Sequence, residues 1–192
     1  MIEIRMHGRG GQGAVIACKI LAGAVYKEGK FAQSFPAFGV ERRGAPVMAF
    51  TRIENKPIHR RTEIYEPDHL IVLDATLLQT IDITTGLKPN GTILINSSLP
   101  AHSFNLPEIF KVATVDASKI AVKHGLGTRS SPIVNTAILG AFSKLTNIVG
   151  IKSVEDAIGE SVPIKAEENV RATHEAYEAL KIEQITQIVE QP

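Results

Sequence analysis

Cysteine is nearly absent from this sequence: Cys18 is the only one among 192 residues. One thiol cannot form a disulfide within the chain, and it cannot supply the four thiolates that an iron–sulfur cluster usually takes. Residues 14–26 are apolar almost all round when drawn as a helix, so we expect Cys18 to be a buried packing residue rather than a reactive thiol. If the protein serves iron–sulfur redox chemistry, the clusters therefore belong to another chain.

An excess of charge of one sign is missing as well. Lysine and arginine number 21, and aspartate and glutamate number 20, which gives a net charge of +1. This balance gives no general electrostatic reason to expect nucleic acid or an acidic membrane surface as a partner. No apolar run approaches the roughly 20 residues that span a bilayer, and residues 2–6 are strand-like rather than part of a signal peptide. We expect a cytoplasmic protein without a nucleic-acid or membrane partner.

Short apolar runs alternate with helical patterns along the chain. This alternation predicts a three-layer α/β fold, in which a mostly parallel, Rossmann-like sheet is flanked by helices. The length fits one domain, and no internal repeat or linker divides residues 1–192. The predicted strands are residues 2–7, 31–37, 47–53, 69–74, 92–95 and 112–115, and the predicted helices are 13–28, one from 116, one from 131, 154–160 and 164–189.

Two of the predicted helices begin at recognisable capping residues. Asp116 fits a helix cap directly after a strand. Ser131 and Pro132 fit a cap followed by proline at the first helical position. The apolar residues that follow Pro132 predict that this helix is largely buried.

A glycine cluster at residues 8–13 joins the first predicted strand to the first predicted helix. Gly8, Gly10 and Gly13 have the G-x-G-x-x-G spacing of loops in which free N–H groups at a helix start attract a phosphate. The alternative is that these glycines only let helix and strand approach each other. Gly11 and the side-chain amide of Gln12 complete the set of possible phosphate contacts.

The dinucleotide-binding form of this fingerprint is incomplete. It includes an acidic residue about 20 residues further on, which binds the ribose hydroxyls. No carboxylate lies between Glu28 and Glu41, so binding of NAD is not expected.

The segment Phe-Gly-Val-Glu-Arg-Arg-Gly-Ala-Pro-Val at residues 38–47 is the most unusual in the chain. Arg42 and Arg43 could grip a phosphate or carboxylate, or pair with acids on a neighbouring subunit, or simply be solvated. Phe35 and Phe38 lie beside them, and arginine with aromatic residues is the composition of interface hot spots. Subunit contact is therefore the preferred interpretation.

Other candidate residues are weaker. The six histidines include no pair at metal-ligand spacing, so no metal site is predicted. Asp74 ends a predicted strand, where α/β sheets place functional groups, although aspartate is also a common helix cap there. Asn96 follows another strand and fits a polar cleft or an ordinary turn, and Asn135 and Thr136 fit helix packing.

Together, the glycine cluster and the segment from Gln33 to Ile53 resemble the gamma subunits of the 2-oxoacid:ferredoxin oxidoreductase family. The resemblance extends over almost the whole chain and is densest before Ile53. It is closer to the enzymes that act on pyruvate (pyruvate synthase) than to those that act on 2-oxoglutarate, and enzymes for branched-chain 2-oxoacids are harder to exclude.

The resemblance implies a place in a larger enzyme. Members convert a 2-oxoacid, coenzyme A and oxidised ferredoxin reversibly to acyl-CoA, carbon dioxide and reduced ferredoxin. Thiamine diphosphate with magnesium, and four-iron–four-sulfur clusters, belong to the alpha, beta and delta subunits. The gamma subunit then has no catalytic residue of its own and is architectural, with a possible part in coenzyme A access through residues 8–13 or Arg42 and Arg43. The alternatives are a stand-alone nucleotide-binding oxidoreductase and an interaction module unrelated to redox chemistry.

Overall fold

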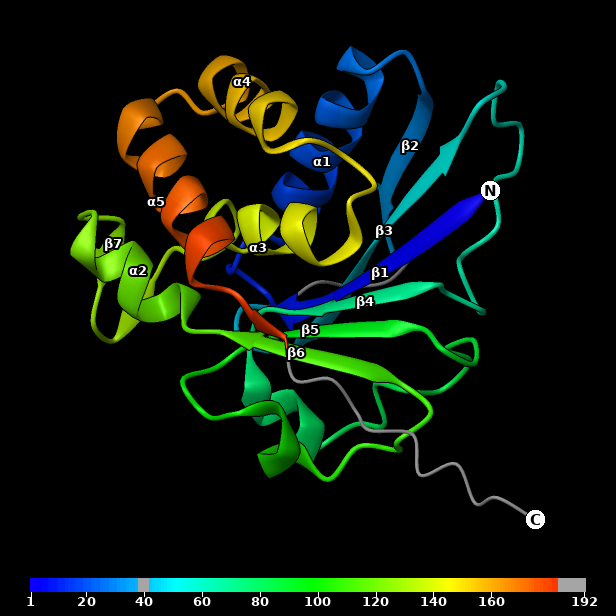
Figure 1. Cartoon of the computed structure of the whole chain (residues 1–192), viewed down its shortest axis with the longest axis horizontal. Coiled ribbons are helices and arrows are strands. Elements are labelled where there is room, and N and C mark those ends of the chain that lie inside the picture. The colour runs from blue at the N-terminus through cyan, green and yellow to red at the C-terminus, as the bar shows by residue number, and fades with distance from the viewer. Residues whose placement is uncertain (38–41, 183–192) are drawn as a thin grey trace.

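The protein, seen here in a computed structural model that describes residues 1–37 and 42–182, is built on one twisted sheet of seven strands (Figure 1). The order of the strands across the sheet is β2-β3-β1-β4-β5-β6-β9. Their bounds are β1 Ile2–Arg9, β2 Phe31–Pro36, β3 Pro46–Glu54, β4 His69–Val72, β5 Thr92–Asn96, β6 Lys111–Val115 and β9 Lys181–Ile182.

Most strands of this sheet run in one direction. β4 pairs parallel to β1, β5 to β4 and β6 to β5. β3 is antiparallel to β1, and β2 is antiparallel to β3, so β2 points the same way as β1. Only β3 and β9 oppose the other five. The predicted α/β sheet, mostly parallel and flanked by helices, is confirmed.

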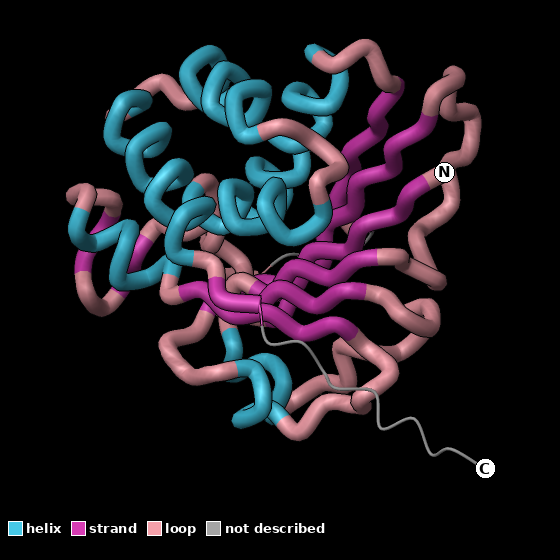
Figure 2. Tube along the Cα trace, viewed as in Figure 1, coloured by secondary structure: helices cyan, strands magenta, loops and turns pink. Residues whose placement is uncertain are grey.

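The helices cover one face of the sheet, and thinner structure covers the other (Figures 1 and 2). Two 3-10 helices, η1 (Ala75–Gln79) and η2 (Ala101–Phe104), lie with their connecting loops on the second face. A hairpin of two short strands, β7 (Gly127–Thr128) and β8 (Ser131–Pro132), stands apart from the main sheet. The helices are α1 Ala14–Lys27, α2 Ala117–Lys123, α3 Ala137–Thr146, α4 Ile151–Ser161 and α5 Ala166–Ala179.

Successive side chains of β1 point to opposite faces of the sheet, and the protein has one apolar core on each face. Ile4 and Met6 are fully buried against the helical side, where they join a core that includes Leu21 of α1 and Phe142 of α3. On the other side, a smaller apolar cluster forms beneath η1 and η2 and includes Val72 of β4. Burial of both faces accounts for the continuous apolar runs of β4 and β5.

Glu3, Arg5 and His7 alternate with the buried apolar residues along β1, and each forms a hydrogen bond through its side chain. Arg52 of β3 is fully buried, and its Nε donates to Glu3 Oε1 over 2.8 Å. Arg5 donates through one terminal nitrogen to the carbonyl oxygens of Ile83 and Thr85 and through Nε to His7. Burial, helped by Arg5, lowers the pKa of His7 to about 3, so His7 is neutral at physiological pH.

The structure corrects the predicted helix that begins at Ser131. Ser131 and Pro132 instead form β8, because Pro132 pairs with Gly127 and the Ser131 N–H donates to Thr128 Oγ1. The helix itself, α3, begins at Ala137.

The predicted helix 164–189 is also too long. α5 ends at Ala179, because Leu180 takes extended dihedral angles and the chain then pairs with β6 as β9. Residues 183–189 of the prediction lie outside the described residues. The strands over residues 2–7, 31–37, 47–53, 69–74, 92–95 and 112–115, helix 13–28 and the Asp116 cap are confirmed, and helix 154–160 is part of α4.

Helix packing generates a prediction with an internal control. A Cβ atom added to Gly140 of α3 would collide with the Thr173 carbonyl oxygen of α5, whereas a Cβ on Gly159 of α4 meets nothing within 4 Å. We expect Gly140→Ala to lower the free energy of unfolding by about 1–3 kcal/mol because it overpacks the helix contact. Gly159→Ala should raise it by about 0.5–1 kcal/mol because alanine favours a helix. Urea denaturation measures both, and changes of the same sign would contradict this account of the α3–α5 contact.

Candidate functional site at the carboxyl edge of the sheet

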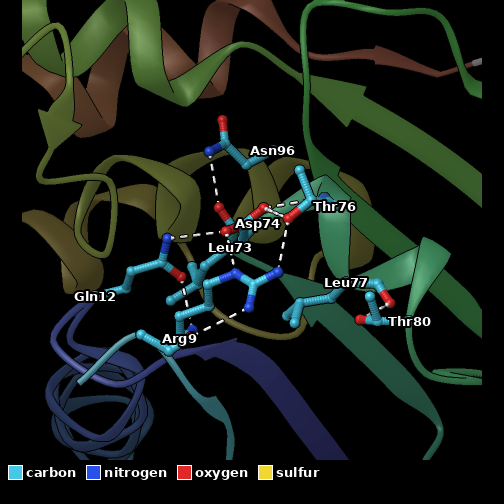
Figure 3. A network of polar contacts seen from close by, with 9 residues as sticks. Arg9, Gln12, Leu73, Asp74, Thr76, Leu77, Thr80 and Asn96 are labelled. Atoms are coloured by element: carbon cyan, nitrogen blue, oxygen red, sulfur yellow. Dashed lines mark hydrogen bonds and ion pairs between the residues drawn. The ribbon is translucent and has the colours of Figure 1, made fainter. Parts of the chain in front are cut away.

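Polar side chains gather where β1, β4 and β5 end (Figure 3). Parallel strands bring their carboxyl ends to one edge of a sheet, where open α/β folds place their ligand sites. Arg9 ends β1, Asp74 follows β4, and Asn96 ends β5. The structure thus brings together two residues that the sequence marked as candidates, Asp74 and Asn96, with one that it did not, Arg9.

Arg9 and Asp74 form the centre of this edge. Arg9 Nε lies 2.9 Å from Asp74 Oδ2. The terminal nitrogens of Arg9 donate to Thr76 Oγ1 over 2.9 Å and to the carbonyl oxygen of Gly44 over 3.1 Å. The positive charge of Arg9 is therefore balanced by Asp74 and its orientation is fixed, as Figure 3 shows.

Asp74 is held in its charged form. Partial burial alone would raise the pKa of its carboxyl group, but hydrogen bonds from the Thr76 hydroxyl and backbone N–H and from Arg9, together with the charge of Arg9, outweigh it. The net result is a pKa of Asp74 below its ordinary value. Asp74 is also the N-cap of η1, since its Oδ1 accepts from the Thr76 N–H over 2.9 Å.

Two amide side chains connect the loops of this edge. Gln12 accepts the Arg9 N–H through Oε1 at 2.8 Å, and its Nε2 lies 3.4 Å from Asp74 Oδ2. Asn96 donates to the Leu73 carbonyl oxygen over 2.9 Å and to Ser118 Oγ over 3.0 Å. Both amides therefore fix the walls of the site through hydrogen bonds within the protein.

These walls enclose a cavity of about 490 Å³. The exposed side chain of Arg129, between β7 and β8, makes no hydrogen bond or ion pair with the described residues. A neighbouring hollow of about 520 Å³ shares Arg129, Ser118 and Pro132 with it and adds Lys119 and Lys123. The polar and backbone groups that line the cavity come from Gly11, Gln12, Asp74, Thr76, Asn96, Ser118, Arg129, Ser130 and Ser131.

Gly10 brings the two sequence motifs into direct contact. Its N–H donates to the Ala45 carbonyl oxygen over 2.9 Å, and its own carbonyl oxygen accepts from the Gly44 N–H over 3.0 Å. A Cβ atom on Gly10 would collide with the carbonyl oxygen of Arg42. The absence of a side chain at Gly10 is therefore what lets the turn of residues 42–45 lie against the end of β1.

The other glycines of the cluster have separate roles. Gly13 caps α1 in the left-handed region, with φ of 79°, and an added Cβ would lie 2.5 Å from Asn135 Nδ2. A Cβ on Gly8 would press on Leu73 at 3.1 Å. Gly11 has φ of 95° but open space around it, and with Gln12 it lines the cavity. Gly8, Gly10 and Gly13 thus fit close packing, while Gly11 and Gln12 face the open site.

Arg42 and Arg43 are exposed, and neither lines the cavity. Of the aromatic residues predicted to join them in a contact surface, Phe35 packs on Phe50 with ring centroids 5.2 Å apart and on the Arg52 guanidinium. Phe38 and Glu41 lie outside the described residues.

Sequence reasoning missed Arg9 and Arg129. Arg9 occupies a variable position of the glycine pattern, and the signal that could have found it is its place at the end of the first predicted strand. Arg129 lies in the β7–β8 turn, where the sequence predicted neither strand.

Cys18 is completely buried, as the sequence predicted, and burial raises the pKa of its thiol to about 12. In residues 1–37 and 42–182, no group of three or more histidine, cysteine, aspartate or glutamate side chains could hold a metal ion. None of the helices in that part of the chain is long and apolar enough to cross a membrane.

Comparison with known proteins identifies the family. The model of the family described as pyruvate ferredoxin/flavodoxin oxidoreductase matches residues 3–179. The chain belongs to this family. Its curated relatives, matched over nearly their whole length, are named as a common subunit gamma or as a subunit PorC of such oxidoreductases.

Two such relatives come from archaea. The pyruvate/ketoisovalerate oxidoreductases common subunit gamma of Pyrococcus furiosus is 51% identical over 188 residues, which cover 95% of this chain and 98% of that protein. The pyruvate synthase subunit PorC of Methanothermobacter marburgensis is 50% identical over 182 residues, which cover 94% of this chain and 98% of the relative.

Solved structures of family members have the same fold. The pyruvate oxidoreductase subunit PORC of Thermotoga maritima matches with a TM-score of 0.80 and 35% identity, over 94% of this chain and 97% of that one. The 2-oxoglutarate:ferredoxin oxidoreductase of Magnetococcus marinus matches with a TM-score of 0.71 at 19% identity, and the match covers 94% of this chain but 31% of the larger one. The second likeness concerns the fold alone.

The contact at Gly10 predicts that two neighbouring glycines respond differently to alanine. In Gly11→Ala the added Cβ atom meets open space, and the free energy of unfolding falls by about 1–2 kcal/mol because alanine is strained in the left-handed backbone at this position. Gly10→Ala should destabilise more, because the added Cβ pushes the 42–45 turn away from β1. We expect a lower melting temperature for Gly10→Ala than for Gly11→Ala and faster trypsin cleavage after Arg42 and Arg43. Equal melting temperatures and cleavage rates would show that the turn is not held by this contact.

The lowered pKa of Asp74 predicts how stability depends on pH. Because its folded-state pKa lies below the unfolded-state value of about 4, its contribution is complete above that value and is lost as pH falls through the folded-state pKa. We expect Asp74→Asn to remove this contribution, so that the unfolding free energy of the variant falls less steeply below about pH 4. Urea unfolding across pH measures the slopes, with Asp156→Asn on an exposed i,i+4 pair as control. Parallel curves for Asp74→Asn and wild type would contradict the prediction.

Proposed function

We propose that this chain is the gamma subunit of a pyruvate:ferredoxin oxidoreductase and that its carboxyl-edge cavity holds the anionic part of coenzyme A. The overall reaction converts pyruvate, coenzyme A and two oxidised ferredoxins to acetyl-CoA, carbon dioxide, a proton and two reduced ferredoxins. The partners in this proposal are the alpha, beta and delta subunits, which carry thiamine diphosphate, magnesium and iron–sulfur clusters. The complex works in the cytoplasm, and this chain contributes one domain, residues 1–192, with no catalytic residue.

The observation that carries the proposal is the unpaired Arg129 beside an open polar cavity. Arg9 is neutralised by Asp74, so Arg129 is the cation of this cavity that is available to an anion. A guanidinium group binds phosphate oxygens through two parallel hydrogen bonds. The hydroxyl groups of Ser118, Ser130 and Ser131 lie around the same cavity and can donate further hydrogen bonds.

The paired hollows fit a ligand with more than one phosphate group. Coenzyme A carries a pyrophosphate and, on its ribose, a 3′-phosphate. Arg129 lies between the cavity and the second hollow, which adds the ammonium groups of Lys119 and Lys123. Asp116 also lines that hollow, and Glu175 pairs with Lys123, so Lys119 is the stronger second candidate. Gly11 leaves its backbone accessible at the mouth of the site.

The topology favours this ligand over NAD. In a dinucleotide-binding unit the strand that follows the first helix lies next to the first strand and ends in an acid for the ribose diol. Here β3 lies between β1 and β2, and no acid ends β2. Coenzyme A has no need of that acid, because one of the two ribose hydroxyls is phosphorylated.

A shared subunit is a second candidate function. The relative from Pyrococcus furiosus, 51% identical, is named as common to pyruvate and ketoisovalerate oxidoreductases. On this pattern the present chain also serves a branched-chain 2-oxoacid enzyme, and the choice of 2-oxoacid lies with the thiamine-bearing subunits.

Arg129→Ala tests the proposed role in the assembled enzyme. We expect the KM for coenzyme A to rise by about tenfold or more, since a charge-assisted hydrogen bond contributes about 1.5–3 kcal/mol. The KM for pyruvate and the subunit stoichiometry should stay unchanged. Arg61→Ala, which removes another exposed arginine away from the cavity, is the matched control.

An unchanged KM for coenzyme A in Arg129→Ala would remove the cavity from the coenzyme site. Flavin absorbance or nicotinamide-dependent turnover in the purified chain would instead support a stand-alone oxidoreductase.

A further inference from the structure

A concave apolar surface lies on the helical side of the sheet, and Arg129 does not line it. It is a groove of about 680 Å³ between α1, the loop before α5 and the segment that follows β8. Three isoleucines on its rim are exposed to an unusual degree: Ile164 by 74%, Ile16 by 54% and Ile133 by 50%. Exposed apolar side chains that converge on one concave surface mark an interaction site, whereas single ones are ordinary.

The polar groups at the floor of this groove are already satisfied. Thr136 Oγ1 donates to Asn169 Oδ1 over 2.6 Å, and Asn169 Nδ2 donates to the Lys165 carbonyl oxygen over 2.8 Å. The Asn135 amide lies against the backbone of Thr136 and Gly13. Because these groups bond to one another, the groove offers an occupant apolar contact rather than free hydrogen-bonding groups at its floor.

The loop before α5 holds its isoleucine outward. Lys165 adopts φ of 55°, in the left-handed region that residues other than glycine rarely occupy. Its ammonium group donates to the Gly125 carbonyl oxygen over 2.6 Å, on the opposite side of the groove. With Pro163 restricting the preceding residues, Ile164 is presented to solvent in a fixed position.

The charge of the groove has one sign. Lys19 and Lys165 line it, and no carboxylate from residues 1–37 or 42–182 does. Lys165 is occupied by Gly125, whereas the exposed Lys19 makes no hydrogen bond or ion pair with the described residues. An occupant that complements the groove is therefore apolar and carries a carboxylate at a position facing Lys19.

We propose that this groove is the docking site for a segment of another subunit of the same oxidoreductase, which inserts apolar side chains between Ile16, Ile133 and Ile164 and pairs an acidic residue with Lys19. The inference rests on the chain being one subunit of a multi-subunit enzyme. Ile133 lines both this groove and the cavity with Arg129, whereas Ile164 and Lys19 line the groove and not the cavity, so variants at Ile164 and Lys19 test assembly apart from coenzyme A affinity.

The test uses the affinity-tagged chain co-expressed with the other subunits of its own enzyme. Ile164→Asp places a carboxylate in the apolar groove, and Lys19→Glu reverses the charge on its rim. We expect each to reduce the amount of other subunits recovered per tagged chain by about tenfold or more, as loss of a central interface contact does. The matched controls are Ile109→Asp, at a site 58% exposed outside the groove, and Lys56→Glu, and they should change recovery by no more than about twofold.

The melting temperature of each purified variant separates docking from folding. The substituted side chains are exposed, so the melting temperature of each variant should match that of the wild type. If Ile164→Asp has a clearly lower melting temperature, the recovery measured with Lys19→Glu decides the test.

Recovery equal to wild type for both groove variants would overturn the proposal. A wild-type chain that purifies as a dimer, and that Ile164→Asp converts to a monomer, would assign the groove to a second copy instead. A small molecule bound to the wild-type chain in native mass spectra and absent from Ile164→Asp would also overturn it. Failure of the wild type itself to recover any partner would count against the proposed function.

Discussion

A backbone-to-backbone contact at Gly10 organises the functional edge of this protein. Two hydrogen bonds join Gly10 to Gly44 and Ala45, in a space that any side chain at Gly10 would fill. The turn seated there supplies one of the acceptors that orient Arg9, and Arg9 in turn neutralises Asp74. The absence of a side chain at Gly10 thus lets this turn help to orient Arg9 toward Asp74, while Arg129 is the unpaired cation that lines the cavity.

The sequence predicted those parts of the fold that depend on local patterns. Apolar runs located β4 and β5, and the cap at Asp116 located α2, because each signal lies within a few residues. The antiparallel insertion of β3 beside β1, the β7–β8 hairpin and the pairing of β9 depend on contacts between distant segments, which a local pattern does not record. At the site, the glycine spacing drew attention to Gly10, but its reason for being glycine is the Arg42 carbonyl oxygen more than 30 positions away.

The cavity and the groove share a wall. Ile133 lines both, and Asn135, two residues later, reaches the backbone at Gly13, where the glycine loop enters α1. The segment between β8 and α3 is therefore bounded by a polar site on one side and an apolar one on the other. A neighbouring subunit seated against Ile133 would restrain the same segment that positions Ser131 at the cavity, so an assembled enzyme would hold this wall more firmly than the free chain.

The order of strands across the sheet also has a meaning for how the chain folds as it is synthesised. The unit formed by β1, α1, β2 and β3 closes within the first 54 residues. Each of the next three strands then adds at the free edge of the sheet: β4 to β1, β5 to β4 and β6 to β5. A chain that emerges from the ribosome N-terminus first can therefore extend its sheet outward without reopening any pair already made. The helical cover is completed after these strands, because α3, α4 and α5 all follow β6 in the chain, and α3 and α5 pack on each other at Gly140. Until α3 has been made, the apolar side chains of β5 and β6 on the helical side stay uncovered, and in that interval the nascent chain is most vulnerable to aggregation.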